Sequence, residues 1–211
     1  MAAAPRKIRK QAVDAVKRDI IKSAAKKLFA ETGLDGTSVR EIARHAGYTT
    51  GAIYFHYADK EELYADILRD SLDALLARIS TSIGATEHPI SALSSAFRSF
   101  VAFYDEYPSD LDLSLYLLSG AKRRGLTPTL NRELNGKVLS VLNLFRHQLV
   151  RAGVKEERLN VEVAGLFDEM IGALVAAHTG RLKVIGADLT DVVEHHTANL
   201  VARLSGPKRW P

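Results

Sequence analysis

The chain has 211 residues, of which 46% are hydrophobic and none is cysteine. This length suits one large domain, or a small domain joined to a larger one, with an ample core. The lack of cysteine excludes disulfides, thiolate metal sites and cysteine nucleophiles, and is typical of a reducing compartment. We find no secretory signal and no stretch of about 20 uncharged apolar residues, and therefore expect a cytoplasmic protein that does not enter a membrane.

The net charge of +4 is unevenly distributed. Residues 1–60 hold 12 Lys and Arg against 6 Asp and Glu, whereas the rest of the chain holds 17 against 19. A basic segment on a mildly acidic body marks where a polyanion such as DNA docks. For residues 1–12 alone, the alternative is a disordered basic tail without a partner.

Apolar residues recur at helical spacing along almost the whole chain, and hairpin signals are absent, which predicts an all-α fold. Three short helices are expected within residues 14–57. Gly33 ends the first, Ser38 and Glu41 form a capping box at the start of the second, and Gly47 ends the second.

Longer helices follow a second expected capping box, formed by Asp59 and Glu62. Prolines at or near first helical positions help to place the later ones, near 59–82, 89–106, 109–119, 128–151, 155–180 and 188–204. The connecting loops are expected at Ser80–His88 and Gly120–Thr127.

Residues 37–63 describe a helix, a tight turn, a second helix and the start of a third. The first of these helices has an apolar face, and the second buries Ile53 and Tyr57 against it. The second helix presents the following residues outward: Thr49, Thr50, Gly51, Ala52, Tyr54, Phe55 and His56. Small side chains at its N-terminus let the backbone enter a DNA major groove, so this pattern predicts a helix-turn-helix.

The same segment resembles the tetracycline-repressor (TetR) family of transcriptional regulators. The resemblance is carried by Thr37, Ile42-Ala43, Ala46-Gly47, Gly51, Tyr54, Tyr57, Lys60 and Leu63, after a basic helix that ends in Glu31-Thr32-Gly33. One departure is Tyr57, where phenylalanine is commoner. The resemblance implies a three-helix DNA-binding domain with a basic N-terminal arm over residues 1–62, followed by a larger helical effector-binding and dimerisation domain over 63–211.

The resemblance also implies the DNA contacts. Tyr54 and Lys60 resemble phosphate contacts, although Lys60 could instead be a solvated surface lysine. Thr37, Ser38 and Thr49 cap helices and contact phosphate, and Arg40 reads a guanine or contacts phosphate. Thr50, Gly51 and Ala52 lie where family members approach bases, and His56 contacts phosphate or a base, unless it is merely exposed.

Family precedent places a small-molecule effector in the C-terminal body, with an apolar wall and a few polar anchors. The candidates are Phe97, Phe100, Tyr104, Leu118, Asn143, Phe145, His147, Phe167 and His178. Each aromatic has the alternative of being plain core. The run Lys122-Arg123-Arg124 suggests an anionic effector, or only a charged loop after a helix.

Homodimerisation is expected through the last two long helices, where family precedent forms a four-helix interface. Their apolar stripes are Val163, Leu166, Phe167, Met170, Ile171, Leu174 and Val175, and Leu189, Val192, Val193, Leu200 and Leu204. No catalytic motif, metal site or cofactor site is found, which argues against an enzyme. The expected function is repression from a near-palindromic operator, relieved by an effector. The alternatives are an activator, an effector-independent DNA-binding protein and a helical adaptor.

Overall fold

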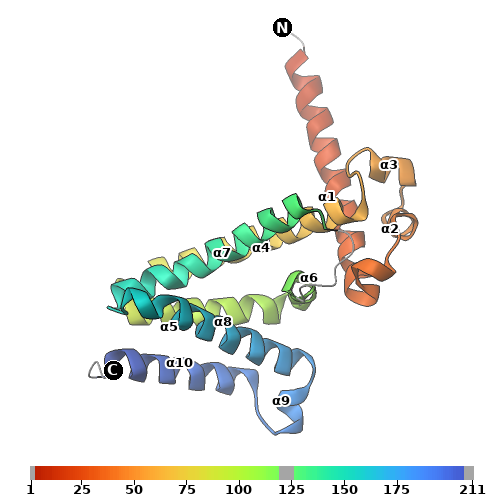
Figure 1. The fold of residues 1–211 in the computed structure, drawn as a ribbon. Helices are drawn as coiled ribbons and strands as arrows, with labels where there is room; N and C mark the ends of the chain where they lie inside the picture. The colour runs from red at the N-terminus through yellow and green to blue at the C-terminus, as the bar shows by residue number, and fades with distance from the viewer. Residues whose placement is uncertain (1–2, 119–125, 207–211) are drawn as a thin grey trace. The chain divides into compact units, whose positions relative to one another are not determined.

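The computed structural model describes residues 3–118 and 126–206, which contain helices and no strand. The all-α prediction is therefore confirmed for these residues (Figure 1). The helices are α1 (Ala3–Gly36), α2 (Val39–Ala46), α3 (Thr50–Tyr54), α4 (Lys60–Gly84), α5 (Pro89–Glu106), α6 (Pro108–Leu118), α7 (Pro128–Arg151), α8 (Glu156–His178), α9 (Arg181–Val184) and α10 (Leu189–Ser205).

The chain divides into two compact units. The first, here called the N-terminal unit, comprises Met1–Asp70 and Ser109–Leu134, and the second, the body, comprises Ser71–Pro108 and Asn135–Pro211. The functional boundary expected between residues 62 and 63 stays a prediction. The N-terminal unit takes in residues 63–70 as well, because Leu63, Tyr64 and Leu68 have no exposed surface.

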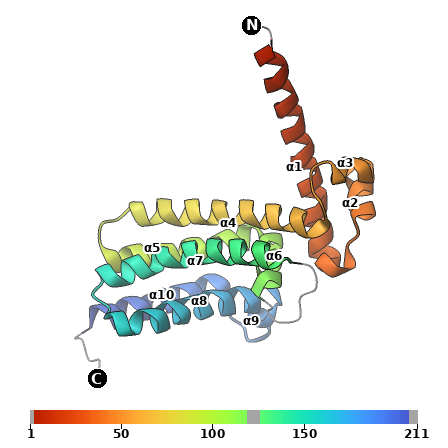
Figure 2. The ribbon, with the colours of Figure 1, turned by 45° about the horizontal axis from the view of Figure 1, so that its top comes forward.

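In the N-terminal unit, α2 packs on α1, and α3 packs on α2 (Figure 1). Ile21, Ile42 and Ile53 are buried within it. The first half of α1 extends beyond α2 and α3 in both ribbon views (Figures 1 and 2). Helix α1 begins at Ala3 and so includes residues 3–12, and contact of these residues with DNA stays a prediction. Alanine, lysine, arginine and glutamine are strong helix formers, which accounts for the longer helix.

The helix ends of the motif follow their local sequence signals. Gly33 has φ 73° and ψ 168°, a conformation that is not helical and is essentially restricted to glycine. Ser38 accepts from the backbone N–H of Glu41, and the Glu41 carboxylate accepts from the backbone N–H of Ser38 at 2.9 Å. Gly47 closes α2 with φ 71°. The capping box and the stop at Gly47 are confirmed, whereas Gly33 interrupts α1 before its end at Gly36.

The second expected capping box forms only in part. Asp59 accepts from the backbone N–H of Glu62 at 2.7 Å, but the Glu62 carboxylate accepts from Ala58 rather than from Asp59. The reciprocal bond is thus displaced by one residue, because Glu62 reaches one residue further back along the turn. Helix α4 begins at Lys60 and continues to Gly84, which makes the loop expected at Ser80–His88 shorter than predicted.

In the body, α5, α8 and α10 pack on one another (Figure 2). Helix α8 ends at His178, and the separate short helix α9 follows; the sequence did not predict it. Gly180 and Gly186, both with φ near 70°, stand on either side of α9. Positive φ favours glycine, so these two residues set the turns that separate α8, α9 and α10.

Two expectations fall partly or wholly outside the described residues. The loop at Gly120–Thr127 is described only for residues 126 and 127, and Lys122-Arg123-Arg124 lies outside the described residues. Across the two described ranges, we find no helix with the length and apolar character needed to span a membrane.

Candidate nucleic-acid interface

Helix α3 has one buried side and one exposed side. Ile53 and Tyr57 are buried, as predicted, and they hold α3 against the rest of the N-terminal unit. The outward side carries small or polar residues first and aromatic rings after them: Thr49, Thr50, Gly51, Tyr54 and Phe55 are exposed, whereas Ala52 and His56 are half-buried. Thr49 is the N-cap and accepts from the N–H of Ala52 at 3.2 Å, so its predicted capping role is confirmed.

The predicted contacts around the start of α2 differ in exposure. Ser38 is exposed and caps α2, but Thr37 is only 3% exposed. The Thr37 hydroxyl donates to the carbonyl of Gly33 at 2.7 Å and lies 2.9 Å from the hydroxyl of Thr32. Thr37 therefore closes the turn between α1 and α2, and Ser38 alone is the N-cap. Arg40 is exposed, and no hydrogen bond or ion pair joins it to another described residue.

Lys60 has a structural role that the sequence did not indicate. Its ammonium donates to the backbone carbonyls of Leu34 at 2.7 Å and of Thr37 at 2.9 Å. The side chain is half-buried, so the alternative of a freely solvated lysine is wrong. The ammonium ties the start of α4 to the α1–α2 turn. Contact of Lys60 with phosphate stays a prediction.

His56 lies between two aromatic rings. Its ring centroid is 5.0 Å from that of Phe55 and 6.4 Å from that of Tyr57. Burial lowers the pKa of His56 below 6.5, and the positive charges of Arg18 and Lys17 lower it further. The imidazole is consequently neutral near pH 7 in the free protein.

The hydroxyl that distinguishes Tyr57 from the commoner phenylalanine has a partner. It donates to Asp66 at 2.8 Å, and Asp66 also pairs with Lys22 at 3.1 Å and with Arg69 at 2.7 Å. Burial alone would raise the pKa of Asp66, but the hydrogen bonds from Tyr57 and Lys22 lower it overall. Burial and the bond to Asp66 raise the pKa of Tyr57. This network anchors the end of α3 to α1 and α4.

The predicted effector residues separate into two groups. Phe100, Tyr104, Phe145 and Phe167 form an aromatic cluster, with centroids 5.1 to 6.5 Å from that of Phe100. Phe97 is fully buried and its ring lies 6.0 Å from that of His196. The aromatic wall is therefore a packed part of the body.

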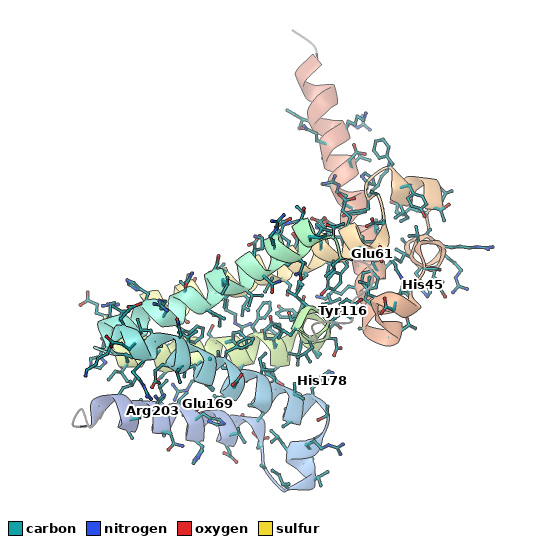
Figure 3. The ribbon with its side chains drawn as sticks, in the orientation of Figure 1. His45, Glu61, Tyr116, Glu169, His178 and Arg203 are labelled. Carbon is teal, nitrogen blue, oxygen red and sulfur yellow. The ribbon has the colours of Figure 1, made fainter. Side chains whose placement is uncertain are left out.

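The predicted polar anchors of the effector site, Asn143, His147 and His178, are exposed and not part of this cluster. Asn143 and His147 are exposed on α7, four residues apart, on the face away from Phe145. His178 is exposed at the end of α8, and Leu118 is exposed and belongs to the other unit (Figure 3). Their role in an effector site stays a prediction.

A groove of about 500 Å³ lies along α1, where His45 of α2 joins it (Figure 3). Its lining is partly apolar and partly charged: Val16, Asp19, Ile20, Ser23, Ala24, Lys27, Leu28, Glu31 and His45. No predicted effector or DNA-contact residue lines it.

Helices α8 and α10, the expected dimer helices, are only partly covered by their own chain. Leu166, Met170, Leu174, Val193 and Leu200 are buried, whereas Val163, Phe167, Ile171, Val175, Leu189, Val192 and Leu204 are half-buried. The buried Glu162 of α8 joins the two helices through an ion pair with Arg203 of α10. Figure 3 labels Arg203. The half-buried residues leave apolar surface open to a partner.

The short α2, the turn at Gly47 and the outward α3 define a helix-turn-helix of the DNA-binding class. Residues 21–67 match the family described as "Bacterial regulatory proteins, tetR family". The HTH-type transcriptional regulator RutR of Escherichia coli K12 is 30% identical over 152 residues, which cover 72% of this chain and 68% of RutR. The chain belongs to the TetR family, and the resemblance seen in its sequence is confirmed.

Two further proteins are similar to the chain, one in sequence over a short stretch and one in fold over most of its length. The HTH-type transcriptional repressor KstR2 of Mycobacterium tuberculosis H37Rv is 43% identical over 70 residues, but the match spans only 35% of KstR2. The transcriptional regulator FadR of Bacillus subtilis, solved with stearoyl-CoA, has a TM-score of 0.70 and 18% identity, covering 87% of this chain and 97% of that one. The relatives named here are regulators, as expected for a chain that is not an enzyme.

Proposed function

We propose that this protein is a sequence-specific transcriptional regulator that binds double-stranded operator DNA, with α3 as the recognition helix in the major groove. The observation that carries the proposal is the exposed side of α3, which bears Thr49, Thr50 and Tyr54. The buried Ile53 and Tyr57 hold the helix in place. The excess of positive charge in residues 1–60 favours the same partner.

Gly51 supports a close approach of DNA. A Cβ atom at this position would meet only the Thr49 hydroxyl at 3.8 Å, an ordinary contact, and the backbone there needs no positive φ. The fold therefore does not require glycine at residue 51. A missing side chain on the exposed side of a recognition helix lets its backbone come nearer to the base edges.

Within this proposal, the predicted contact residues have different tasks. Arg40 reads a guanine or contacts a phosphate, Thr50 and Ala52 approach base edges, and Tyr54 donates to a phosphate. Lys60 donates to the carbonyls of Leu34, Asp35 and Thr37, and the longest of these bonds, 3.4 Å to Asp35, is the one that a phosphate oxygen would replace. Thr37 acts through the α1–α2 turn, because its hydroxyl is buried and bonded there.

The regulatory form that we propose is a homodimer that represses from a near-palindromic operator. Pairing of α8 and α10 with their two-fold mates would cover their half-buried apolar residues. Two recognition helices about 34–36 Å apart then meet successive major grooves.

A small molecule that binds the body more tightly in another conformation would release the DNA. The solved structure of FadR of B. subtilis with stearoyl-CoA gives one example of an amphipathic ligand on a similar fold. The alternatives are an activator and an effector-independent DNA-binding protein. A reporter gene whose promoter lies beside the operator distinguishes these functions. Expression of the protein lowers transcription if it is a repressor, raises it if it is an activator, and leaves it unchanged if it only binds DNA.

The test is selection of bound duplexes from a random DNA library, followed by titration of the winner and a scrambled duplex. Thr50→Glu places a carboxylate on the exposed side of α3 and should weaken operator binding by about 100-fold. Thr81→Glu, near the end of α4, makes the same chemical change on an exposed surface outside the helix-turn-helix and the proposed dimer helices, and should bind as the wild type does.

The outcomes differ clearly. Selection of an inverted repeat supports the proposal if the wild type and Thr81→Glu bind it equally and Thr50→Glu binds it poorly. Binding of every duplex alike would instead favour an architectural protein. Absence of binding to any duplex would contradict a DNA-binding function.

A further inference from the structure

Phe55 is the exception among the phenylalanines of this protein. All seven lie in the described ranges; five are buried, Phe167 is half-buried, and Phe55 is 71% exposed. It follows Tyr54 directly at the C-terminal end of α3, and that ring is exposed as well. The sequence predicts DNA contacts for Tyr54 and His56, on either side of Phe55, and none for Phe55 itself.

The ring of Phe55 is held in place without being buried. The His56 ring meets it edge to face, with centroids 5.0 Å apart and an interplanar angle of 85°. His56 in turn lies beside Tyr57, which is buried and bonded to Asp66. An exposed aromatic ring is thus positioned through two neighbouring rings on the anchored end of α3.

The chemistry of the ring restricts its partner on DNA. Phenylalanine has no donor or acceptor, so it cannot satisfy a phosphate oxygen or the polar edge of a base. The apolar group that the major groove offers is the C5-methyl of thymine. A ring on the outward side of the recognition helix fits this group.

We propose that Phe55 is a specificity-determining residue whose ring packs on the C5-methyl of one thymine in each operator half-site. The inference rests on the proposed function, because it places α3 in the major groove. It adds an apolar contact to the polar contacts expected of Arg40, Thr50 and Tyr54.

The experiment uses the operator selected with the wild-type protein and replaces its thymines with deoxyuridine, one symmetric pair at a time. This change removes only the C5-methyl. Loss of one methyl contact per half-site should weaken wild-type binding about fourfold for each half-site at one thymine position, and not at the others. Phe55→Ala should bind the unmodified operator less tightly and respond to deoxyuridine at that position hardly at all.

Phe55→Leu provides the matched control, because an apolar side chain of similar reach should keep part of the response. Phe55→Ala should unfold at the same urea concentration as the wild type, which separates the DNA contact from folding. An operator that both proteins bind with the same deoxyuridine profile would overturn the role of Phe55 alone. Failure to select any operator would contradict the proposed function itself.

Discussion

The outward side of α3 and the core of the body place their aromatic side chains in opposite surroundings. In the N-terminal unit, Tyr54 and Phe55 are turned to the outside of α3. In the body, Phe97, Phe100 and Phe145 are buried. An interior ring contributes mainly to stability, whereas an exposed ring on a rigid support is available to a partner.

The comparisons with other proteins also set the helix-turn-helix apart. Residues 21–67, all in the N-terminal unit, match the tetR family, whereas FadR, aligned over 87% of the chain, is only 18% identical. Local signals such as the Ser38–Glu41 capping box depend on particular residues, but a helical core accepts many apolar combinations of suitable volume. The function of this chain is therefore easier to predict from its helix-turn-helix than from its body.

The sharpest way to break this comparison is the same substitution in both units. Phe97→Ala should lower the free energy of unfolding by about 3–5 kcal/mol, because it empties a fully enclosed site. Phe55→Ala should change it by less than about 0.5 kcal/mol, since the ring is exposed. Urea titrations followed by circular dichroism measure both. A loss below about 1.5 kcal/mol for Phe97→Ala would show that the site relaxes easily or already adjoins empty space.

Ion pairs give a second contrast, now within the body. Arg203→Ala leaves the buried Glu162 with only the more distant Arg158, at 3.9 Å, and should cost about 2 kcal/mol. Arg98→Ala removes a bidentate pair with the exposed Glu194, at 2.7 Å for both bonds, and should cost less than about 1 kcal/mol. Equal losses in urea titration would mean that burial of Glu162 does not set the difference.

Short-range signals made much of the fold predictable. The Ser38–Glu41 pair and Gly47 act within a few residues, so the sequence places the ends of α2 correctly. Helix α9 was missed because four residues are too few to show helical periodicity. The glycines on either side of it, Gly180 and Gly186, were the available signal.

Long-range contacts account for the other differences. Lys60 binds carbonyls 23 and 26 residues earlier in the chain, and no local pattern encodes such a bond. The exposed positions of Asn143 and His147 could have been inferred, because both lie on the helix face opposite Phe145. The sequence shows a hydroxyl at Tyr57, where phenylalanine is commoner. It does not show that Asp66 accepts from this hydroxyl, because that bond depends on how the segment after α3 packs against α4.

Capping offers a smaller effect that tests the local character of the N-terminal unit. Ser38→Ala removes the acceptor for the N–H of Glu41 and should lower the free energy of unfolding by about 1 kcal/mol. Ser140→Ala, on an exposed turn of α7, should cause no loss, because alanine is the better helix former there. If Ser38→Ala proved neutral in urea unfolding, the capping box would not help to stabilise α2.

The smallest expected effect concerns His56 and pH. Its pKa lies below 6.5 in the free protein, through burial and the charges of Arg18 and Lys17, so it is neutral at pH 7.5. A phosphate contact would stabilise the imidazolium and raise this pKa, so that the complex binds more protons than the free protein. Operator affinity should therefore rise by roughly twofold per half-site as the pH falls from about 7.5 to 6 at constant salt.

His56→Gln isolates this contribution, because the other six histidines are present in both proteins. The operator affinity of the variant should change less between the two pH values than that of the wild type. Identical pH dependences would mean that His56 takes up no proton on binding. The neutral ring would then serve only to position Phe55, and the thymine response of Phe55 should weaken in His56→Gln although the pH dependence does not change. Together, these two results would show that His56 supports the contact of Phe55 with a base and takes up no proton from a phosphate contact of its own.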